Sequence, residues 1–283
     1  MISLGSVVQR LKPAFLGSSV HTCGLASCGR TRFGKWRGAV TLNDVWYCSA
    51  NCVEAGLLED LASEQNRRVS LHHHRLPLGL LLLEQERISA SELDAAVQYR
   101  RLHPQERIGG ALQKIAGVSQ TLIAQTVAAQ WGCPSVTSHK MPICREAQLP
   151  YEFLHEHSTA PMYWEPRGRV LLLGFLFRLD YVAMAAIERV LRCTVKPCIL
   201  TEDLFRQVML ELSERNPRNA AIFPSRFKKD HRARIVRNYV EEIGAEEIRV
   251  GTGSCYQWIR LNQPRDMDLL FALPADAEPG VEI

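Results

Sequence analysis

The chain has 283 residues, which suggests two or three compact units rather than one. Hydrophobic residues make up 46% and charged residues 23%, so the chain can bury cores and wholesale disorder is excluded. The net charge of +4 is too small to indicate a polyanion-binding protein by itself. The longest apolar run, 76–83, is far shorter than the roughly 20 residues of a bilayer-spanning helix. Arg10 and Lys12 interrupt the N-terminal stretch before a signal peptide can form, so we expect a cytoplasmic protein.

Four of the nine cysteines form two close pairs near the N-terminus, Cys23 with Cys28 and Cys48 with Cys52. Two such pairs can supply four thiolates to one tetrahedral Zn²⁺. A strand-rich hairpin is expected between the pairs, with 41–47 as its return strand, and helical spacing follows the second pair. Spacing and element order resemble a treble-clef zinc finger. Because all four ligands come from the protein, a structural Zn²⁺ is favoured over a catalytic one. Four buried cysteines without metal remain the alternative.

The predicted hairpin carries a basic cluster with an aromatic residue inside it, formed by Arg30, Arg32, Lys35, Trp36 and Arg37. Such a loop can contact phosphates and stack on a base. A solvated hairpin whose Trp packs against the zinc knuckle explains the same residues. Both interpretations stay open.

The middle of the chain repeats with a period of 30 residues. A polar stretch, 63–74, is expected to be a linker, and two similar segments follow it. In each segment a short helix carries Gly-x-x-Leu, then Ser89 or Ser119 is placed to cap a second helix. Two such helical hairpins cannot bury their apolar faces alone, so we expect them to pack as one helical domain over 75–136.

This tandem motif resembles the N-terminal domain of the bacterial type II secretion and type IV pilus assembly ATPases. The second copy keeps Arg-x-Gly-x-x-Leu from Arg107 to Leu112 and ends in Gln130, and the order of elements continues to match as far as residue 213. In the first copy Pro77 stands where the Arg belongs, with Arg75 two residues earlier. The internal Gly of each copy is replaced, by Glu86 and Ala116.

In one branch of that family the paired motifs bind cyclic di-GMP. Glycine lets the backbone approach a ligand, Arg meets a phosphate or guanine, and Leu packs against the base or ribose. The resemblance therefore implies a candidate ligand site made of corresponding residues in the two copies. These are Arg75, Leu78, Gly79 and Leu82 in the first copy, and Arg107, Ile108, Gly109 and Leu112 in the second.

The family's motor domain has no counterpart in this sequence. Nothing matches Gly-x-x-x-x-Gly-Lys-Ser/Thr, the loop whose amides bind phosphates. We therefore expect no ATPase activity, and no catalytic residue is assigned. His155-Glu156-His157 is interpreted as a surface turn rather than a metal site.

The remaining sequence predicts two further modules. Residues 137–215 alternate strands and helices as a small α/β subdomain, with a helix over 180–191 and another over 204–212. Residues 216–276 predict a basic helix and a three-stranded meander, with Asp266-Met267-Asp268 as a turn. The tail, 277–283, is expected to be disordered.

The fold class predicted is therefore an α+β multi-module protein. The modules are a zinc finger over 1–62, the tandem-motif domain, the small α/β unit and the C-terminal helix plus antiparallel meander. The leading function is a non-catalytic regulatory or docking protein with cyclic di-GMP as a candidate ligand and a protein partner, such as a secretion or pilus apparatus. The alternative is a zinc-finger nucleic-acid-binding protein that uses the basic hairpin 30–37 and the basic helix 226–237.

Overall fold

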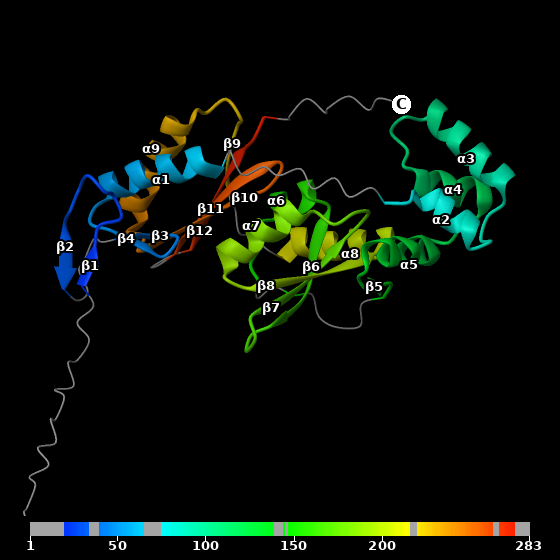
Figure 1. Cartoon of the computed structure of the whole chain (residues 1–283), viewed down its shortest axis with the longest axis horizontal. Helices are drawn as coiled ribbons and strands as arrows, with labels where there is room; N and C mark the ends of the chain where they lie inside the picture. The colour runs from blue at the N-terminus through cyan, green and yellow to red at the C-terminus, as the bar shows by residue number, and fades with distance from the viewer. Residues whose placement is uncertain are drawn as a thin grey trace, which may run out of the picture.

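A computed structural model describes residues 20–33, 40–64, 75–138, 144, 147–215, 220–262 and 266–274. These residues form a two-stranded sheet of β1 (Val20–Thr22) and β2 (Thr31–Phe33) and two larger mixed sheets. In Figure 1 the larger mixed sheet lies at the left, the smaller one in the middle, and a bundle of short helices at the right. The predicted α+β multi-module class is confirmed. In the described part of the chain, no helix is both long and apolar enough to cross a bilayer.

The larger sheet has six strands and joins the two ends of the chain. In spatial order they are β4 (Val45–Tyr47), β3 (Val40–Leu42), β10 (Glu247–Thr252), β11 (Tyr256–Asn262), β12 (Met267–Ala272) and β9 (Ala221–Phe223). Strands β10 to β12 form the predicted antiparallel meander. Strand β3 adds to it in parallel, with Ile248 opposite Leu42. The cysteine-bearing segment and the C-terminal segment therefore share one sheet, which local sequence patterns did not predict.

Two helices cover one face of this sheet. Helix α1 (Ala50–Glu64) packs against α9 (Lys229–Ile243), and the figure shows the two side by side (Figure 1). Leu57, Val236 and Ile248 lie in the same core and are fully buried. Burial of these apolar side chains, at roughly 25 cal/mol per Å², holds the N-terminal and C-terminal segments together.

The smaller sheet has four strands in the spatial order β5 (Ser135–Val136), β8 (Thr194–Leu200), β7 (Val170–Phe175) and β6 (Thr159–Glu165). Its helices are α6 (Tyr151–Glu156), α7 (Tyr181–Leu191) and α8 (Glu202–Arg215). Asp180 caps α7 by accepting a hydrogen bond from the Ala183 N–H. Helix α7 packs against both β8 and β10, so it lies between the two sheets.

Four helices form the tandem-motif domain, and they follow the predicted repeat. They are α2 (Leu78–Glu84), α3 (Ala90–Leu102), α4 (Ile108–Ala116) and α5 (Gln120–Trp131). Ser89 accepts a hydrogen bond from the Glu92 N–H, and Ser119 accepts one from the Leu122 N–H, so both predicted caps are present. The second helix of the second copy, α5, also packs against β8 and so joins the domain to the smaller sheet.

The internal glycine of the second copy is present, one residue later than expected. Ala116 is the last residue of α4, and Gly117 follows it with φ 63°. In the first copy Glu86 itself adopts φ 55°. The left-handed turn is therefore kept in both copies, although a side chain makes this conformation costly in the first.

Three local predictions need correction. Met267 and Asp268 belong to strand β12 and Asp268 is buried, so the expected turn at 266–268 is wrong. The expected single strand over 41–47 is two strands joined at Asn43 and Asp44, which have φ 47° and 72°. The surface turn at 155–157 is wrong for His157, which follows α6 and is buried.

Several predicted segments lie partly or wholly outside the described residues. Helix α1 continues to Glu64, so it extends into the stretch expected to be a linker, whose remainder lies outside the described residues. Most of the basic hairpin, 34–39, and the tail, 277–283, also lie outside them.

Candidate metal centre and candidate ligand cavity

The four predicted metal ligands lie together. Their sulfur atoms all lie within 4.8 Å of one another. Cys48 Sγ is 3.5 Å from Cys28 Sγ and 3.6 Å from Cys52 Sγ. A tetrahedral Zn²⁺ with Zn–S bonds of about 2.3 Å separates its sulfur ligands by about 3.8 Å, so the arrangement fits such an ion.

Local packing positions this cluster. The Gly24 N–H donates to the Trp46 carbonyl at 2.7 Å, which closes the first cysteine turn onto β4. A Cβ on Gly24 would lie 2.3 Å from the Val45 side chain, so the approach needs glycine. Cys52 lies in the first turn of α1, as predicted, where free N–H groups favour a thiolate.

The thiols of the cluster differ in acidity. Hydrogen bonds from the Arg30 backbone and from Cys48 lower the pKa of Cys28 to about 7. Burial, together with its cysteine neighbours, raises the pKa of Cys48 to about 12. A divalent cation removes this difference because it favours the thiolate at every ligand.

A cavity of about 590 Å³ lies between the tandem-motif domain and the smaller sheet. Its walls are the α3–α4 connection, one face of α5, and the segments that follow β7 and β8. Because β7 and β8 are parallel, their carboxyl ends meet at this edge, which is where open α/β sheets commonly bind ligands.

The structure brings some of the predicted ligand residues to the cavity and not others. Leu78, Arg107, Ile108 and Gly109 line it. Those that do not line it are Arg75, Gly79, Leu82 and Leu112. Leu82 and Leu112 are fully buried in the helical core, and Gly79 packs against Leu93, so these three residues support the motifs by packing.

Arg100 lines this cavity as an exposed cation, and Arg107 is the motif cation there. Its guanidinium lies over the Phe177 ring, 3.7 Å from the centroid, and Phe177 also lines the cavity. Burial and the nearby charge of Arg178 lower the pKa of Arg107, although it stays charged at neutral pH. Arg107 is also the N-cap residue of α4 and makes no side-chain capping bond, so the first N–H groups of that helix have no partner from their cap.

Arg75 has a different environment. It lies over the Trp131 ring, 3.7 Å from the centroid, and its Nη1 donates to the Gln130 carbonyl at the end of α5. The Gln130 amide in turn donates to the Leu76 carbonyl. Arg75 thus ties the segment before α2 to the end of α5.

Sequence reasoning missed the part of the cavity that the smaller sheet supplies. Phe177, Thr201 and Glu202 follow β7 and β8 and line the cavity opposite the motif residues. The sequence marks Glu202 only as an acidic residue just before the predicted helix 204–212. No local signal connects these positions to a motif about 70 to 95 residues earlier.

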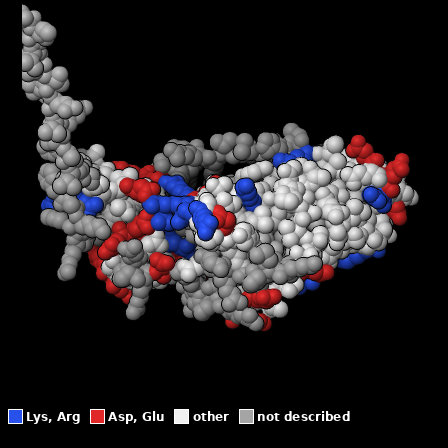
Figure 2. All heavy atoms as spheres, turned by 90° about the horizontal axis from the view of Figure 1, so that it is seen from below, with Lys and Arg blue, Asp and Glu red and all other residues white. Residues whose placement is uncertain are grey.

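The basic segment 226–237 is only partly free to bind a partner. Arg232 is buried and donates to the Phe227 and Ala272 carbonyls. Arg237 pairs with Glu54 of α1 at 2.9 Å. On the face shown in Figure 2, Lys and Arg cluster beside Asp and Glu rather than forming an uninterrupted basic stripe.

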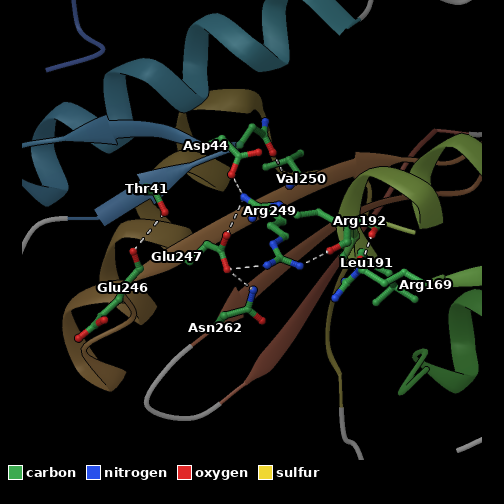
Figure 3. Close-up of polar contacts among 12 residues, drawn as sticks. Thr41, Asp44, Arg169, Leu191, Arg192, Glu246, Glu247, Arg249, Val250 and Asn262 are labelled. Atoms are coloured by element: carbon green, nitrogen blue, oxygen red, sulfur yellow. Dashed lines mark hydrogen bonds and ion pairs between the residues drawn. The ribbon is translucent and has the colours of Figure 1, made fainter. Parts of the chain in front are cut away.

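A polar network joins α7 to the larger sheet (Figure 3). Arg192, which ends α7, pairs with Glu247 of β10 at 2.9 Å and with Asp44 at the β3–β4 turn. Arg249 pairs with Glu247 at 2.8 Å and donates to the Val190 carbonyl at 3.0 Å. Charged groups from the cysteine-bearing segment, the smaller sheet and the C-terminal meander therefore meet at one point.

No family model matches the sequence, and no curated protein matches it. Solved structures similar to the chain include MshE with cdg, at 20% identity and a TM-score of 0.41, which covers 48% of this chain and 99% of that one. The N-terminal domain of XpsE is also similar in two crystal forms. The first form has 20% identity and a TM-score of 0.34, and the match covers 47% of this chain and 91% of that one. The second form has 21% identity and a TM-score of 0.28, and the match covers 46% of this chain and 89% of that one. The similarity is one of fold and assigns no ligand, partner or residue role to this chain.

Proposed function

We propose that this chain is a regulatory or docking protein whose tandem-motif domain binds a small ligand, with cyclic di-GMP as the first candidate. The observation that carries the proposal is the cavity of about 590 Å³ that Arg107 and Phe177 line together, with the Arg107 guanidinium over the Phe177 ring. This volume lies within the range of small-molecule sites, roughly 300–1,000 Å³. Four of the eight residues that the resemblance implies as ligand contacts line this cavity.

The same resemblance supports a protein partner. The N-terminal domains of secretion and pilus ATPases belong to multi-protein machines, so the proposed output of ligand binding is a change in docking to such an apparatus. The chain itself is proposed to be non-catalytic. Purified protein is expected to show no ATP turnover, and hydrolysis that co-purifies through several columns and disappears in a variant of this chain would overturn that part.

We further propose that the four-cysteine cluster holds a structural Zn²⁺. Four thiolates at tetrahedral spacing suit this ion, and no ligand position remains for a substrate. Metal analysis of protein purified under reducing, chelator-free conditions is expected to give one zinc per chain.

Calorimetric titration of cyclic di-GMP tests the ligand. Saturable binding is expected in wild-type protein, and Arg107→Ala is expected to weaken it at least about tenfold because a charge-assisted contact is lost. Arg101→Ala is the matched control, since Arg101 is exposed and does not line the cavity. Absence of binding to metal-loaded, folded wild-type protein would remove cyclic di-GMP as the ligand.

A further inference from the structure

A set of aromatic and apolar side chains surrounds Arg75 on the surface, and we call it the Arg75 patch. Its members are Arg75 and Leu76 just before α2, Trp131 at the end of α5, and Tyr181 and Val182 at the start of α7. The Arg75 guanidinium lies 3.7 Å from the Trp131 ring centroid, and the Trp131 and Tyr181 centroids are 6.1 Å apart. Leu76, Tyr181 and Val182 are 58%, 40% and 47% exposed, so the patch faces solvent.

Arg75 has no counter-charge in this patch. Its Nη1 donates to the Gln130 carbonyl, and the half-buried side chain pairs with no carboxylate in the part of the chain that the structure describes. Its Nε is buried and has no hydrogen-bond partner there either. A guanidinium keeps its charge at neutral pH and forms its strongest hydrogen bonds with anionic oxygens. The patch is therefore an apolar surface with one uncompensated positive charge.

The composition of the patch favours a protein partner over a nucleic acid. Trp, Tyr and Arg carry most of the binding energy at protein interfaces, and the aliphatic residues beside them add apolar area. One face of the Trp131 ring is covered by Arg75, and Arg75 is the only cation among the five residues. Binding to a phosphate backbone rests on several cations and on free aromatic faces. A single carboxylate next to an apolar side chain matches this set better.

We propose that the Arg75 patch docks a segment of a partner protein, which places a carboxylate on Arg75 and an apolar side chain against Leu76 and Tyr181. This rests on the docking part of the proposed function, for which it names the surface and the chemistry of the partner. None of the five patch residues lines the cavity. Gln130 connects the two sites, because it lines the cavity and its carbonyl accepts the Arg75 hydrogen bond.

The test selects a phage-displayed library of random peptides on wild-type protein. The selected peptides are then synthesised, and fluorescence anisotropy measures their affinity. We expect the selected sequences to be enriched in Asp or Glu beside Leu, Ile, Phe or Trp. The same selection on Arg75→Gln is expected to lose the enrichment in Asp and Glu, because the variant has no cation in the patch.

Two patch variants and two matched controls locate the binding. Arg75→Gln keeps an amide N–H for the Gln130 carbonyl and removes the charge, whereas Leu76→Asp changes an exposed side chain and repels a carboxylate. We expect each to weaken the selected peptides at least about tenfold. Leu210→Asp, at a residue 59% exposed on α8, and Arg101→Gln, at an exposed residue of α3, are expected to change the affinity less than about twofold. Thermal melts check that all four variants are folded.

The outcomes separate the docking surface from the proposed ligand. A selection that yields no binding peptide, peptides without enriched carboxylates, or equal affinities in wild-type protein and the two patch variants would overturn the Arg75 patch. Binding of a mixed-sequence single-stranded DNA that is lost in Arg75→Gln, without selected peptides, would replace the protein partner by a nucleic acid. Titration of cyclic di-GMP reports on the cavity alone, so the patch stands or falls whether or not that ligand binds.

Discussion

Asp268 and Arg260 form a bidentate pair, with Arg260 Nε 2.7 Å from Asp268 Oδ1 and Arg260 Nη2 2.9 Å from Asp268 Oδ2. The two side chains lie opposite each other on β11 and β12 and are only 3% and 5% exposed as residues. The Trp258 indole N–H also donates to Asp268, at 2.8 Å. Arg260 in addition donates to the Gln148 carbonyl, so the pair connects the larger sheet to the segment before α6.

Removing the carboxylate is expected to destabilise the protein strongly. Asp268→Ala leaves a buried guanidinium without its counter-charge, which typically costs about 3–5 kcal/mol. Urea unfolding measures the loss, and Asp94→Ala, on an exposed face of α3, is the control with an expected change within about 0.5 kcal/mol. A loss in Asp268→Ala no larger than in the control would show that the pair is not formed in solution.

The acid stability of the protein is expected to depend on Asp180. Its Oδ2 lies 2.7 Å from Nδ1 of the buried His157, and the Ser254 hydroxyl donates to the same oxygen at 3.3 Å. Burial alone would raise the pKa of Asp180, but the hydrogen bonds from His157, Ala183 and Ser254 outweigh it and lower the pKa.

Because the pKa is lower in the folded state, the stabilisation is complete above the unfolded value of about 3.9 and is lost as pH falls through the folded value. Asp180→Asn keeps a good N-cap residue but not the charge. We expect the variant to be about 1–2 kcal/mol less stable than wild-type protein at pH 7, with the difference shrinking below about pH 4. Urea unfolding at a series of pH values measures this, and a difference that grows toward low pH would contradict the assignment.

Glu86→Gly is expected to stabilise the tandem-motif domain. Glu86, the second residue after α2, adopts φ 55°, and Gly117, the first residue after α4, adopts φ 63°. A side chain in this conformation costs roughly 1–2 kcal/mol, and part of the gain is offset by the greater freedom of glycine in the unfolded chain. We expect a net gain of about 0.5–1 kcal/mol, and a loss of similar or greater size for the reverse change, Gly117→Ala. Thermal melts of both variants show independently whether each substitution raises or lowers the stability.

Metal removal is expected to loosen the C-terminal meander as well as the cysteine-bearing segment. Strand β3 lies against β10, and α1 packs on α9, so the cluster is linked directly to the larger sheet. Hydrogen exchange is expected to quicken in β10 and α9 after chelation, while the buried amides of α5 stay protected. Unchanged exchange in β10 would show that the sheet is independent of the metal.

The elements that the sequence predicted correctly are those that depend on residues close together in the chain. The Ser89 and Ser119 caps, the cysteine pairs and the alternating strands of the meander all depend on residues close together in sequence. Helix α6 was not predicted because it has only six residues, directly after Pro150, which is too short for a helical pattern of apolar residues to be recognised. The pairing of β3 with β10 could not be predicted, since three residues carry too little pattern to specify a partner some 200 residues away.

The candidate metal site could be predicted from the sequence, whereas the candidate ligand cavity could be predicted only in part. The metal ligands were predictable because thiolate spacing alone specifies the chemistry. Only the motif side of the cavity was predictable. Phe177 and Glu202 reach it through the parallel pairing of β7 with β8, and the role of Arg75 depends on Trp131, which is distant from it in sequence.

The parallel pairing of β3 with β10 also bears on how the chain folds as it is synthesised. The cysteine-bearing segment emerges from the ribosome before the C-terminal meander, and the sheet that β3 joins is complete only after residue 272 has emerged. Contacts of such long sequence separation form slowly, because the loop between them must be ordered first. Until then the apolar face of α1 has no α9 to cover it, so the nascent chain carries exposed hydrophobic surface through most of its synthesis.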